Sequence, residues 1–238
     1  MLYIQLFLVV LLLKNLNDSK PKFIICASCG IEPRKCINYY TLVIKAIKLS
    51  HLQNQSQILL FQRDNADKVS DKEISESGIK TLILNEEMNK IPNDIIVECK
   101  ILNSNDILYT LYTSGTTGIP KGIVRDIGGC AVTANFTMKY ILNLNKGDII
   151  FSSSDIGWIV GHLFIVYGLL RWAITILFEG KPIGNPNCNK CFELIEKYKV
   201  KVFYIAPTVV RAYKKEDPNY EIIHKPNVSS LESIYLSF

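Results

Sequence analysis

The chain has 238 residues, with 27 Lys and Arg against 22 Asp and Glu, which gives a net charge of +5. This mild charge is scattered along the sequence, so it gives no argument for nucleic-acid binding, and we expect no nucleic-acid partner. Apolar residues make up 48% of the chain, which excludes a mostly disordered protein and allows a sizeable core.

The first thirteen residues, Met1 to Leu13, form a strongly apolar run whose role the sequence leaves open. The run is too short to span a bilayer. It has the length of a signal-peptide apolar region, but it lacks a basic start, and Lys14–Asn17 is not a small-residue cleavage site. We expect neither secretion nor membrane anchoring, and we consider residues 1–13 separately from residues 14–238.

Hydrophobic periodicity predicts strands that alternate with helices. The predicted strands are Lys22–Cys26, which reads as buried, Gln57–Phe61, Ile107–Tyr112, Ile149–Ser152, Ile174–Phe178 and Val202–Ile205. The predicted helices are Tyr39–Ser50, with Leu42, Ala46 and Leu49 on one face, Gly128–Leu142, Gly161–Leu170 and Asn189–Tyr198. Arg63–Ser77 is expected to be a polar surface loop with a short helix. Pro207 suits the first turn of a further helix, and the run from Ser233 reads as a buried strand.

This alternation indicates an α/β fold, with a largely parallel sheet and helices on its faces. Seven cysteines, an odd number, argue against a fully paired disulfide framework. The pairs Cys26/Cys29 and Cys188/Cys191 have a spacing that can bind zinc, but no histidine stands near either at ligand spacing. We favour free thiols in a reducing compartment.

The most informative stretch is Tyr112 to Asp126, which reads Tyr-Thr-Ser-Gly-Thr-Thr-Gly-Ile-Pro-Lys-Gly-Ile-Val-Arg-Asp. Its hydroxyl groups can donate hydrogen bonds to phosphate, and its glycines let backbone N–H groups approach an anion. Its lysine supplies a compact positive charge. The candidate phosphate-binding residues are Thr113, Ser114, Gly115, Thr116, Thr117, Gly118 and Lys121.

This loop is neither the Walker type nor the dinucleotide type. Pro120 stands where the Walker pattern requires its second glycine, Gly122 follows the lysine, and Gly-x-Gly-x-x-Gly does not occur here. The loop resembles the phosphate-binding signature of the AMP-forming adenylating enzymes, which include acyl-CoA synthetases, luciferases and peptide-synthetase adenylation domains. A plain Ser/Thr/Gly hairpin is the alternative, which the particular order of residues disfavours.

A second segment, Ser153 to Leu170, resembles the acyl-pocket segment of the short-chain acyl-CoA synthetases that activate acetate and propionate. By this resemblance the acyl-pocket residues are Trp158, Ile159, Val160 and Gly161. Acetate-activating relatives often have Thr at the place of Val160, whereas propionate-type members have Val. Ordinary core packing is the alternative for Trp158 and Val160. We expect His162 to be structural or part of the pocket wall, because an ionised carboxylate needs no general base.

Further blocks carry the same resemblance, in the family's order. They are Ser19–Lys22, Ala27–Pro33, Leu177–Gly184, which is similar to the propionyl-CoA synthetase version, Ile205–Ala212 and Asp217–Pro218. Arg34 and Lys35 stand near where relatives contact the phosphates of coenzyme A. Because this loop departs from the Arg-Gly-Gly form of many relatives, a merely solvated pair is the alternative.

The resemblance implies that residues 14–238 are a partial AMP-binding (adenylation) domain, part of the large N-terminal domain of the adenylate-forming fold. Three downstream family motifs are not found: an aromatic Tyr-x-x-Thr-Glu segment, a ribose-binding aspartate, and a C-terminal domain with the adenylation lysine. We therefore expect a domain truncated at its C-terminal end, with the C-terminal domain missing and no catalytic residue present.

The implied reaction activates a short-chain carboxylate, propionate or acetate, with ATP and transfers the acyl group to coenzyme A, releasing AMP and pyrophosphate. Mg²⁺ usually takes part. No metal ligand is directly assigned, but the hydroxyl of Thr116 or Thr117 is the expected neighbour of the ion. We expect the chain alone to be inactive, and the alternative is a non-catalytic, nucleotide-binding remnant. The expected compartment is cytoplasmic or mitochondrial, and the oligomeric state is left open.

Overall fold

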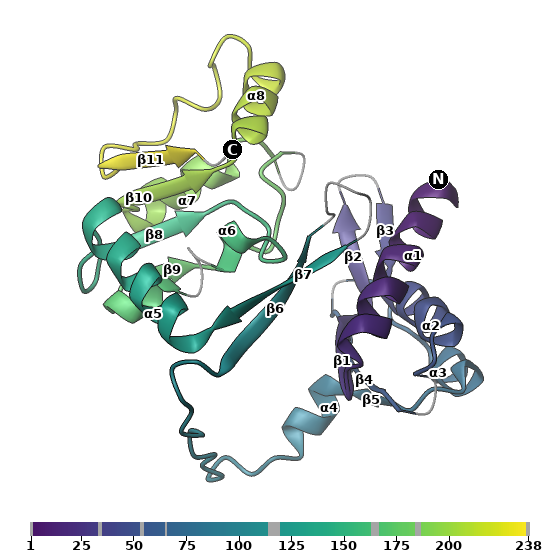
Figure 1. Ribbon diagram of the computed structural model, residues 1–238. Helices are drawn as coiled ribbons and strands as arrows, with labels where there is room; N and C mark the ends of the chain where they lie inside the picture. The colour runs from purple at the N-terminus through teal and green to yellow at the C-terminus, as the bar shows by residue number, and fades with distance from the viewer. Residues whose placement is uncertain are drawn as a thin grey trace. The chain divides into compact units, whose positions relative to one another are not determined.

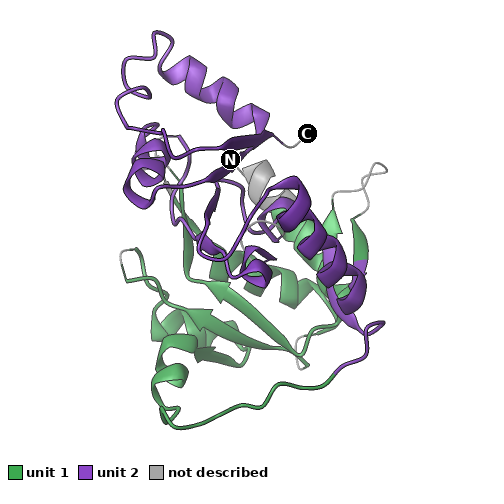
Figure 2. Ribbon diagram, turned by 90° about the vertical axis from the view of Figure 1, so that its left-hand side faces the viewer, with its two compact units in different colours: residues 1–101, 112–123 green, residues 102–111, 124–238 purple. Residues whose placement is uncertain are grey.

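The computed structural model describes residues 2–32, 35–52, 55–64, 66–113, 120–162, 167–183 and 187–236. The chain divides into two compact units (Figure 2). Unit 1 consists of Met1–Ile101 and Tyr112–Ile123, and unit 2 consists of Leu102–Leu111 and Val124–Phe238. Each unit has its own parallel sheet, so the predicted α/β class is confirmed, although the parallel strands form two sheets instead of one.

The sheet of unit 1 has the strand order β1-β4-β5, with all neighbours parallel (Figure 1). Its strands are β1 (Phe23–Ala27), β4 (Gln57–Phe61) and β5 (Thr81–Ile83). On the central strand β4, Ile58 and Leu60 are fully buried. On the edge strand β1, Phe23 is 55% and Ile25 is 68% exposed. The prediction that β1 is buried is therefore wrong, because alternate side chains of an edge strand point to the uncovered face.

The helices that the structure describes in unit 1 are α1 (Leu2–Ser19), α2 (Tyr39–Leu49), α3 (Asp71–Ser77) and α4 (Leu84–Asn89). The apolar start of the chain lies within α1, which packs on α2, and Val9 and Leu16 are buried in the same core as Ile47 and Ile58. Among the helices that the structure describes, none is long and apolar enough to cross a membrane.

Helix α2 begins where the Asn38 side chain accepts a hydrogen bond from the Thr41 N–H, and its buried side includes Val43 and Ile47. The predicted apolar face was partly wrong, because Leu49 is 63% exposed. Leu49 is the last residue of the helix, and the buried residues of α2 end at Ile47. Helix α3 confirms the short helix expected in the polar segment, and it begins at a capping box of Ser70 and Glu73.

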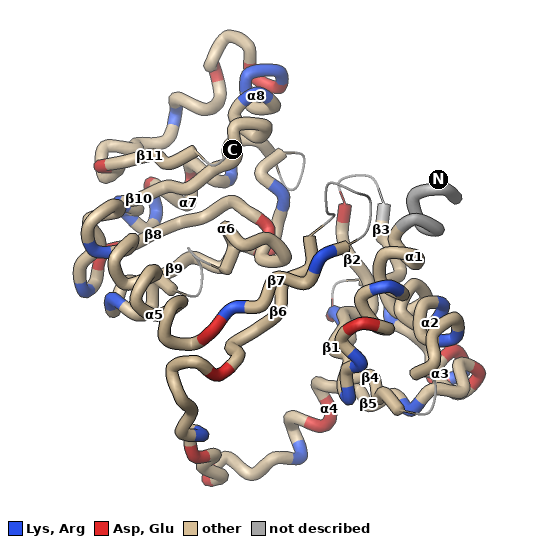
Figure 3. The backbone as a smooth tube through the Cα atoms, in the orientation of Figure 1, with Lys and Arg blue, Asp and Glu red and all other residues tan. Residues whose placement is uncertain are grey.

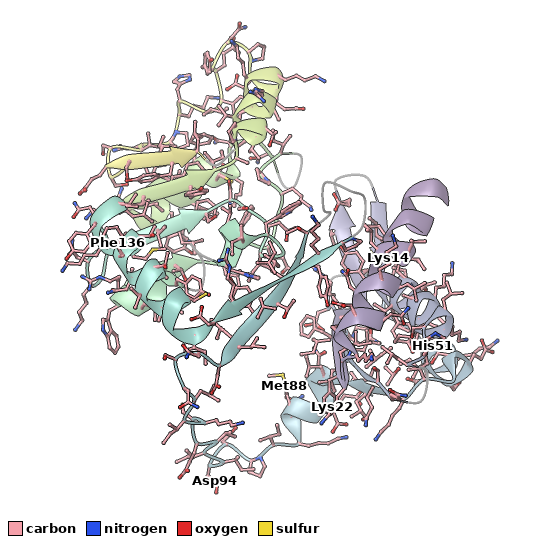
Figure 4. The ribbon with its side chains drawn as sticks, viewed as in Figure 1. Lys14, Lys22, His51, Met88, Asp94 and Phe136 are labelled. Carbon is pink, nitrogen blue, oxygen red and sulfur yellow. The ribbon has the colours of Figure 1, made fainter. Side chains whose placement is uncertain are left out.

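Between β1 and α2 the chain forms an antiparallel hairpin of β2 (Cys29–Glu32) and β3 (Lys35–Asn38), which the sequence did not indicate. Figure 4 places Met88 on α4 and Asp94 in the segment that connects α4 to the next strand. That segment has no helix or strand, and it exposes large apolar side chains, with Ile96 at 88% and Ile101 at 96%.

The sheet of unit 2 has the order β11-β10-β8-β9 and is parallel throughout. Its strands are β8 (Ile149–Ser152), β9 (Ile174–Ile176), β10 (Val202–Ile205) and β11 (Ser233–Leu236). The strand predicted from Ser233 onward is present. It is not buried as expected, because β11 lies at the sheet edge and Ile234 is 56% exposed.

Helices cover both faces of this sheet (Figure 1). On β8, Ile150 packs in a core with Met138, while its neighbour Phe151 packs in a second core with Ile195. Successive strand residues point to opposite faces, so the two cores lie on opposite sides of the sheet. The helical elements are α5 (Ile127–Phe136), the π-helix η1 (Thr137–Ile141), α6 (Ile159–Gly161), the 3₁₀ helix η3 (Tyr167–Arg171), α7 (Lys190–Tyr198) and α8 (Pro207–Glu216).

Two predicted helices differ in detail from the structure. The helix expected at 128–142 changes to π geometry from Thr137. The helix expected at 161–170 is represented by the end of α6 and by η3, and residues 163–166 lie outside the described residues. Pro207 occupies the first turn of α8, as predicted. Basic and acidic residues are interspersed along the described parts of both units (Figure 3).

Candidate functional site

The candidate phosphate loop joins two paired strands, β6 (Ile107–Thr113) and β7 (Lys121–Asp126). A connection this short cannot join parallel strands, so the pair is an antiparallel ribbon, and Thr113 and Lys121 stand at the two ends of the connection. Thr113 is half-buried and Lys121 is exposed. Ser114, Gly115, Thr116, Thr117 and Gly118 lie outside the described residues. A hydroxyl residue and a lysine therefore stand at the two ends of the loop.

A hydrogen bond within unit 1 holds the strand end that leads into the loop. The Tyr112 hydroxyl donates to Asp18 Oδ2 at 2.6 Å, and Asp18 lies near the C-terminus of α1. Burial and then this bond to Asp18 raise the pKa of Tyr112, so the phenol remains a neutral donor. Asp18 belongs to no recognisable motif, and no sequence pattern predicts this contact.

The other end of the ribbon is fixed within unit 2. The N–H of Ile127 donates to the Asp106 carbonyl at 3.0 Å, and the N–H of Gly128 donates to the Ser104 carbonyl at 2.8 Å. A Cβ on Gly128 would lie 2.8 Å from the Ser104 Cβ, so glycine permits this close approach. The start of α5 is thereby tied to the segment that leads into β6.

The candidate acyl segment is built on a tight turn followed by α6. The Asp155 carboxylate accepts a hydrogen bond from the Gly157 N–H at 2.7 Å, and the Asp155 carbonyl accepts one from the Trp158 N–H at 3.1 Å. Gly161 is buried against this turn, and a Cβ there would collide with the Asp155 carbonyl oxygen and with the Ile156 Cα. Backbone atoms cannot move aside as a side chain can, so this turn leaves room only for glycine at position 161.

The remaining acyl-segment residues differ in burial. Ile159 and Val160 are half-buried, and Val160 packs against the core that contains Met138 and Ile150. Trp158 is 62% exposed and joins none of the three cores of the described chain. Core packing therefore accounts for part of the role of Val160, whereas Trp158 is left with its indole accessible.

Behind the acyl segment lies a cluster of polar and aromatic side chains that the sequence did not reveal. The His162 ring meets the Tyr109 ring edge-on, with centroids 5.1 Å apart, and its buried Nδ1 has no hydrogen-bond partner among the described residues. Burial, followed by interactions with Tyr109 and Cys130, raises the pKa of Tyr167. The buried Tyr109 hydroxyl likewise has no hydrogen-bond partner among the described residues. Four elements, β6, α5, α6 and η3, therefore meet here.

Comparison with known proteins decides the family. Residues 12–237 match the family described as AMP-binding enzyme. The chain belongs to this family. The resemblance found in the phosphate loop is thereby confirmed.

Curated relatives of this chain include acyl-CoA synthetase short-chain family member 3, mitochondrial, from Mus musculus, which is 36% identical over 224 residues. That match covers 94% of this chain and 32% of the relative. Propionate–CoA ligase from Escherichia coli K12 is 38% identical over 227 residues, covering 94% of this chain and 34% of the relative. The chain thus spans about a third of the length of these curated relatives.

A solved structure confirms the fold. Acetoacetyl-CoA synthetase from Streptomyces lividans superposes with a TM-score of 0.74 at 20% sequence identity. The match covers 96% of this chain and 32% of that one.

The structure says less about the other predicted site residues. Arg34 lies outside the described residues, and Lys35 begins β3, with its side chain also outside them. All seven cysteines are free, and no group of three or more His, Cys, Asp or Glu in the described ranges could hold a metal ion. The phosphate-loop flanks belong to unit 1 and the acyl segment belongs to unit 2.

Proposed function

We propose that this chain carries the ATP-phosphate loop and the acyl-pocket segment of an AMP-forming short-chain acyl-CoA synthetase, with propionate or acetate as the acid. The observation that carries the proposal is the Tyr112–Asp126 motif on the β6–β7 turn, where Thr113 and Lys121 flank one loop. Membership of the AMP-binding enzyme family and the names of the curated relatives support it.

The proposed reaction has two steps. A carboxylate oxygen attacks the α-phosphorus of ATP, and pyrophosphate leaves, which gives an acyl adenylate. The thiol of coenzyme A then attacks the acyl carbonyl, and AMP leaves. The first step needs positioning and charge stabilisation on the leaving phosphates. We assign this role to Thr113, Ser114, Gly115, Thr116, Thr117, Gly118 and Lys121.

The acyl pocket is proposed to include Trp158, Ile159, Val160 and Gly161. The exposed Trp158 indole offers an apolar surface to a short acyl chain, and the Asp155 turn holds the segment in place. One methylene in an apolar pocket changes binding by about 1–3 kcal/mol. A valine at position 160 would therefore favour propionate over acetate only modestly.

Mg²⁺ and coenzyme A complete the proposal. Mg²⁺ would be carried mainly by the phosphates of ATP, with the hydroxyl of Thr116 or Thr117 beside it, and it would neutralise charge there. Hydroxyl groups fit that position, because Mg²⁺ prefers oxygen ligands and retains several waters. Arg34 and Lys35 are proposed to contact coenzyme A phosphates. The mitochondrial and bacterial relatives support a mitochondrial or cytoplasmic site of action.

We further propose that residues 1–238 do not complete either step alone, because the chain spans about a third of relatives named for the whole reaction. The test is propionate- or acetate-dependent exchange of labelled pyrophosphate into ATP. We expect no exchange from this chain. Exchange well above a carboxylate-free control would show that residues 1–238 suffice for adenylation.

The alternative is a nucleotide-binding protein without catalysis, and the size of the native protein separates the two. An antibody to the polar segment 66–77 would detect the protein in its source cells. A band much larger than 27.0 kDa supports the synthetase. A band at 27.0 kDa that binds ATP without exchange would favour the non-catalytic alternative.

A further inference from the structure

The acyl segment is carried by a helix that is too short to be stable by itself. α6 spans only Ile159–Gly161, and an isolated helix of this length does not persist in water. The N–H of His162 closes the end of α6, because it donates to the carbonyl oxygens of Trp158, at 3.2 Å, and of Ile159. Trp158 and Ile159 therefore keep their orientation only if His162 is held by another part of the fold.

A side chain of β6 holds His162. The His162 ring meets the Tyr109 ring edge-on, with the ring centroids 5.1 Å apart and the ring planes at 80°. An edge-on pair of aromatic rings changes an equilibrium constant by about two- to tenfold beyond the burial of its surface. The contact is therefore strong enough to decide where the His162 ring lies.

Tyr109 is itself held by the core of unit 2. It is half-buried, and it packs against the core that contains Met138 and Ile150, as the acyl-segment residue Val160 also does. Both neighbours of Tyr109 on β6 are exposed, because successive side chains of a strand point to opposite faces. The Tyr109 side chain thus contacts both a packed core and the residue that closes α6.

The contact between Tyr109 and His162 depends on the tyrosine ring and not on its hydroxyl group. The Tyr109 hydroxyl and His162 Nδ1 are both buried, and neither has a hydrogen-bond partner among the described residues. A buried polar group without a partner does not stabilise the fold. Removal of the hydroxyl should therefore leave His162 in place, whereas removal of the ring should release it.

We propose that Tyr109 is a positioning residue for the acyl segment. Its ring holds His162, and His162 in turn fixes Trp158 and Ile159 in the orientation in which they meet a short acyl chain. The role of Tyr109 is indirect, because it acts through His162. The contact with the acyl chain rests on the proposed function, whereas the hold on Trp158 does not.

Trp158 can report its own position. The chain has two tryptophans, and the other one, Trp172, is 77% exposed. Trp172→Phe leaves Trp158 as the single tryptophan, and this variant is the reference chain for the test. The fluorescence anisotropy of Trp158 measures how firmly its indole is held, and the change of its emission on addition of propionate measures binding of the acid.

Removal of the Tyr109 ring should affect both readings. In the reference chain, Tyr109→Leu should lower the anisotropy of Trp158 and weaken propionate binding about fivefold, which is the loss expected for one edge-on ring contact. Tyr109→Phe keeps the ring and should match the reference chain in both readings. Tyr140→Leu is the matched control, because it makes the same change at a tyrosine that is 64% exposed on η1, and it should also leave both readings unchanged.

A purely structural role of Tyr109 predicts a different result. Tyr109→Leu would then lower the resistance to urea but leave the anisotropy and the propionate affinity of the folded chain unchanged, and this result would overturn the proposal. If Tyr109→Leu does not fold, His162→Ala removes the same contact from the other side and should show the same losses. If the reference chain gives no response to propionate, the proposed acyl pocket is wrong, and a lower anisotropy in Tyr109→Leu alone would still support the hold on Trp158.

Discussion

The two candidate binding segments are held in opposite ways. All residues of β7, on one side of the phosphate loop, are exposed, and a hydrogen bond from Tyr112 to Asp18 helps to hold the strand end on the other side. The acyl segment is held by Gly161 against the Asp155 turn and by Val160 against a core. The described flanks of the phosphate motif are therefore held by a strand pair and a hydrogen bond, whereas the acyl motif is held by close packing.

The largest expected effect follows from Gly161. Gly161→Ala places a Cβ onto backbone atoms of Asp155 and Ile156, and such overpacking should lower the free energy of unfolding by about 3 kcal/mol. Gly157→Ala is the matched control, because its Cβ would meet only Asp155 Oδ1, at 3.1 Å. Urea unfolding should separate the two variants clearly. Equal losses would show that the acyl segment is no more tightly packed at Gly161 than at its surface turn.

A smaller effect is expected at Val160. Val160→Ala removes methyl groups that pack on the core of unit 2, which should cost about 1–2 kcal/mol. Val132→Ala, at a site 72% exposed on α5, should change stability by less than about 0.5 kcal/mol. If the two variants match in urea, Val160 does not contribute to the core and only its proposed pocket role remains.

The Tyr112–Asp18 bond should contribute less again. It is an exposed hydrogen bond, so Tyr112→Phe should lower stability by about 0.5–1 kcal/mol. A double-mutant cycle with Asp18→Ala isolates the pair from other contacts of each side chain. Coupling well above this range would mean that the phosphate-loop ribbon is held as firmly as the acyl segment.

The sheet behind the acyl segment provides a pH test with the smallest expected effect. Burial by itself would raise the pKa of Asp148, but hydrogen bonds from Lys201 and from the Asn145 N–H outweigh it and lower that pKa. A carboxyl with a lowered folded pKa contributes stability above its unfolded pKa, near 4, and that contribution is lost as pH falls through the folded value. Asp148→Asn should therefore reduce the loss of stability below about pH 4, measured by urea unfolding at each pH. If Asp148→Asn loses as much stability below about pH 4 as the parent chain, the Asp148 carboxylate does not stabilise the folded state.

The local pattern of apolar residues was sufficient to predict the bounds of the central strands. Gln57–Phe61, Ile149–Ser152 and Val202–Ile205 were predicted at the bounds that the structure shows, because each is a short apolar run in the middle of a parallel sheet. The edge strands β1 and β11 were placed correctly but wrongly expected to be buried. Position within a sheet depends on which strands pair, and no local pattern encodes that pairing.

For the candidate site, the sequence indicated the motifs but not the residues that hold them in place. The order of residues at 112–126 indicated the family, which the match over residues 12–237 confirms, and its phosphate-binding role stays a prediction. Asp18, which holds Tyr112, and the cluster of Tyr109, Cys130 and Tyr167 behind His162 come from distant segments. Contacts of this kind form only when the units fold, so they leave no spacing to recognise.

The central claim is that the loop between β6 and β7 binds ATP phosphates. The most direct test is a titration of the chain with ATP, with binding measured by calorimetry or by displacement of a fluorescent nucleotide. Lys121→Ala should weaken ATP binding about tenfold, because it removes one charged contact to phosphate at an exposed site. Lys146→Ala, which removes an exposed lysine from a turn in unit 2, should leave the affinity unchanged, and neither variant should alter stability. If the parent chain binds no ATP, or if both lysine variants bind as the parent does, the β6–β7 turn is not an ATP-phosphate site.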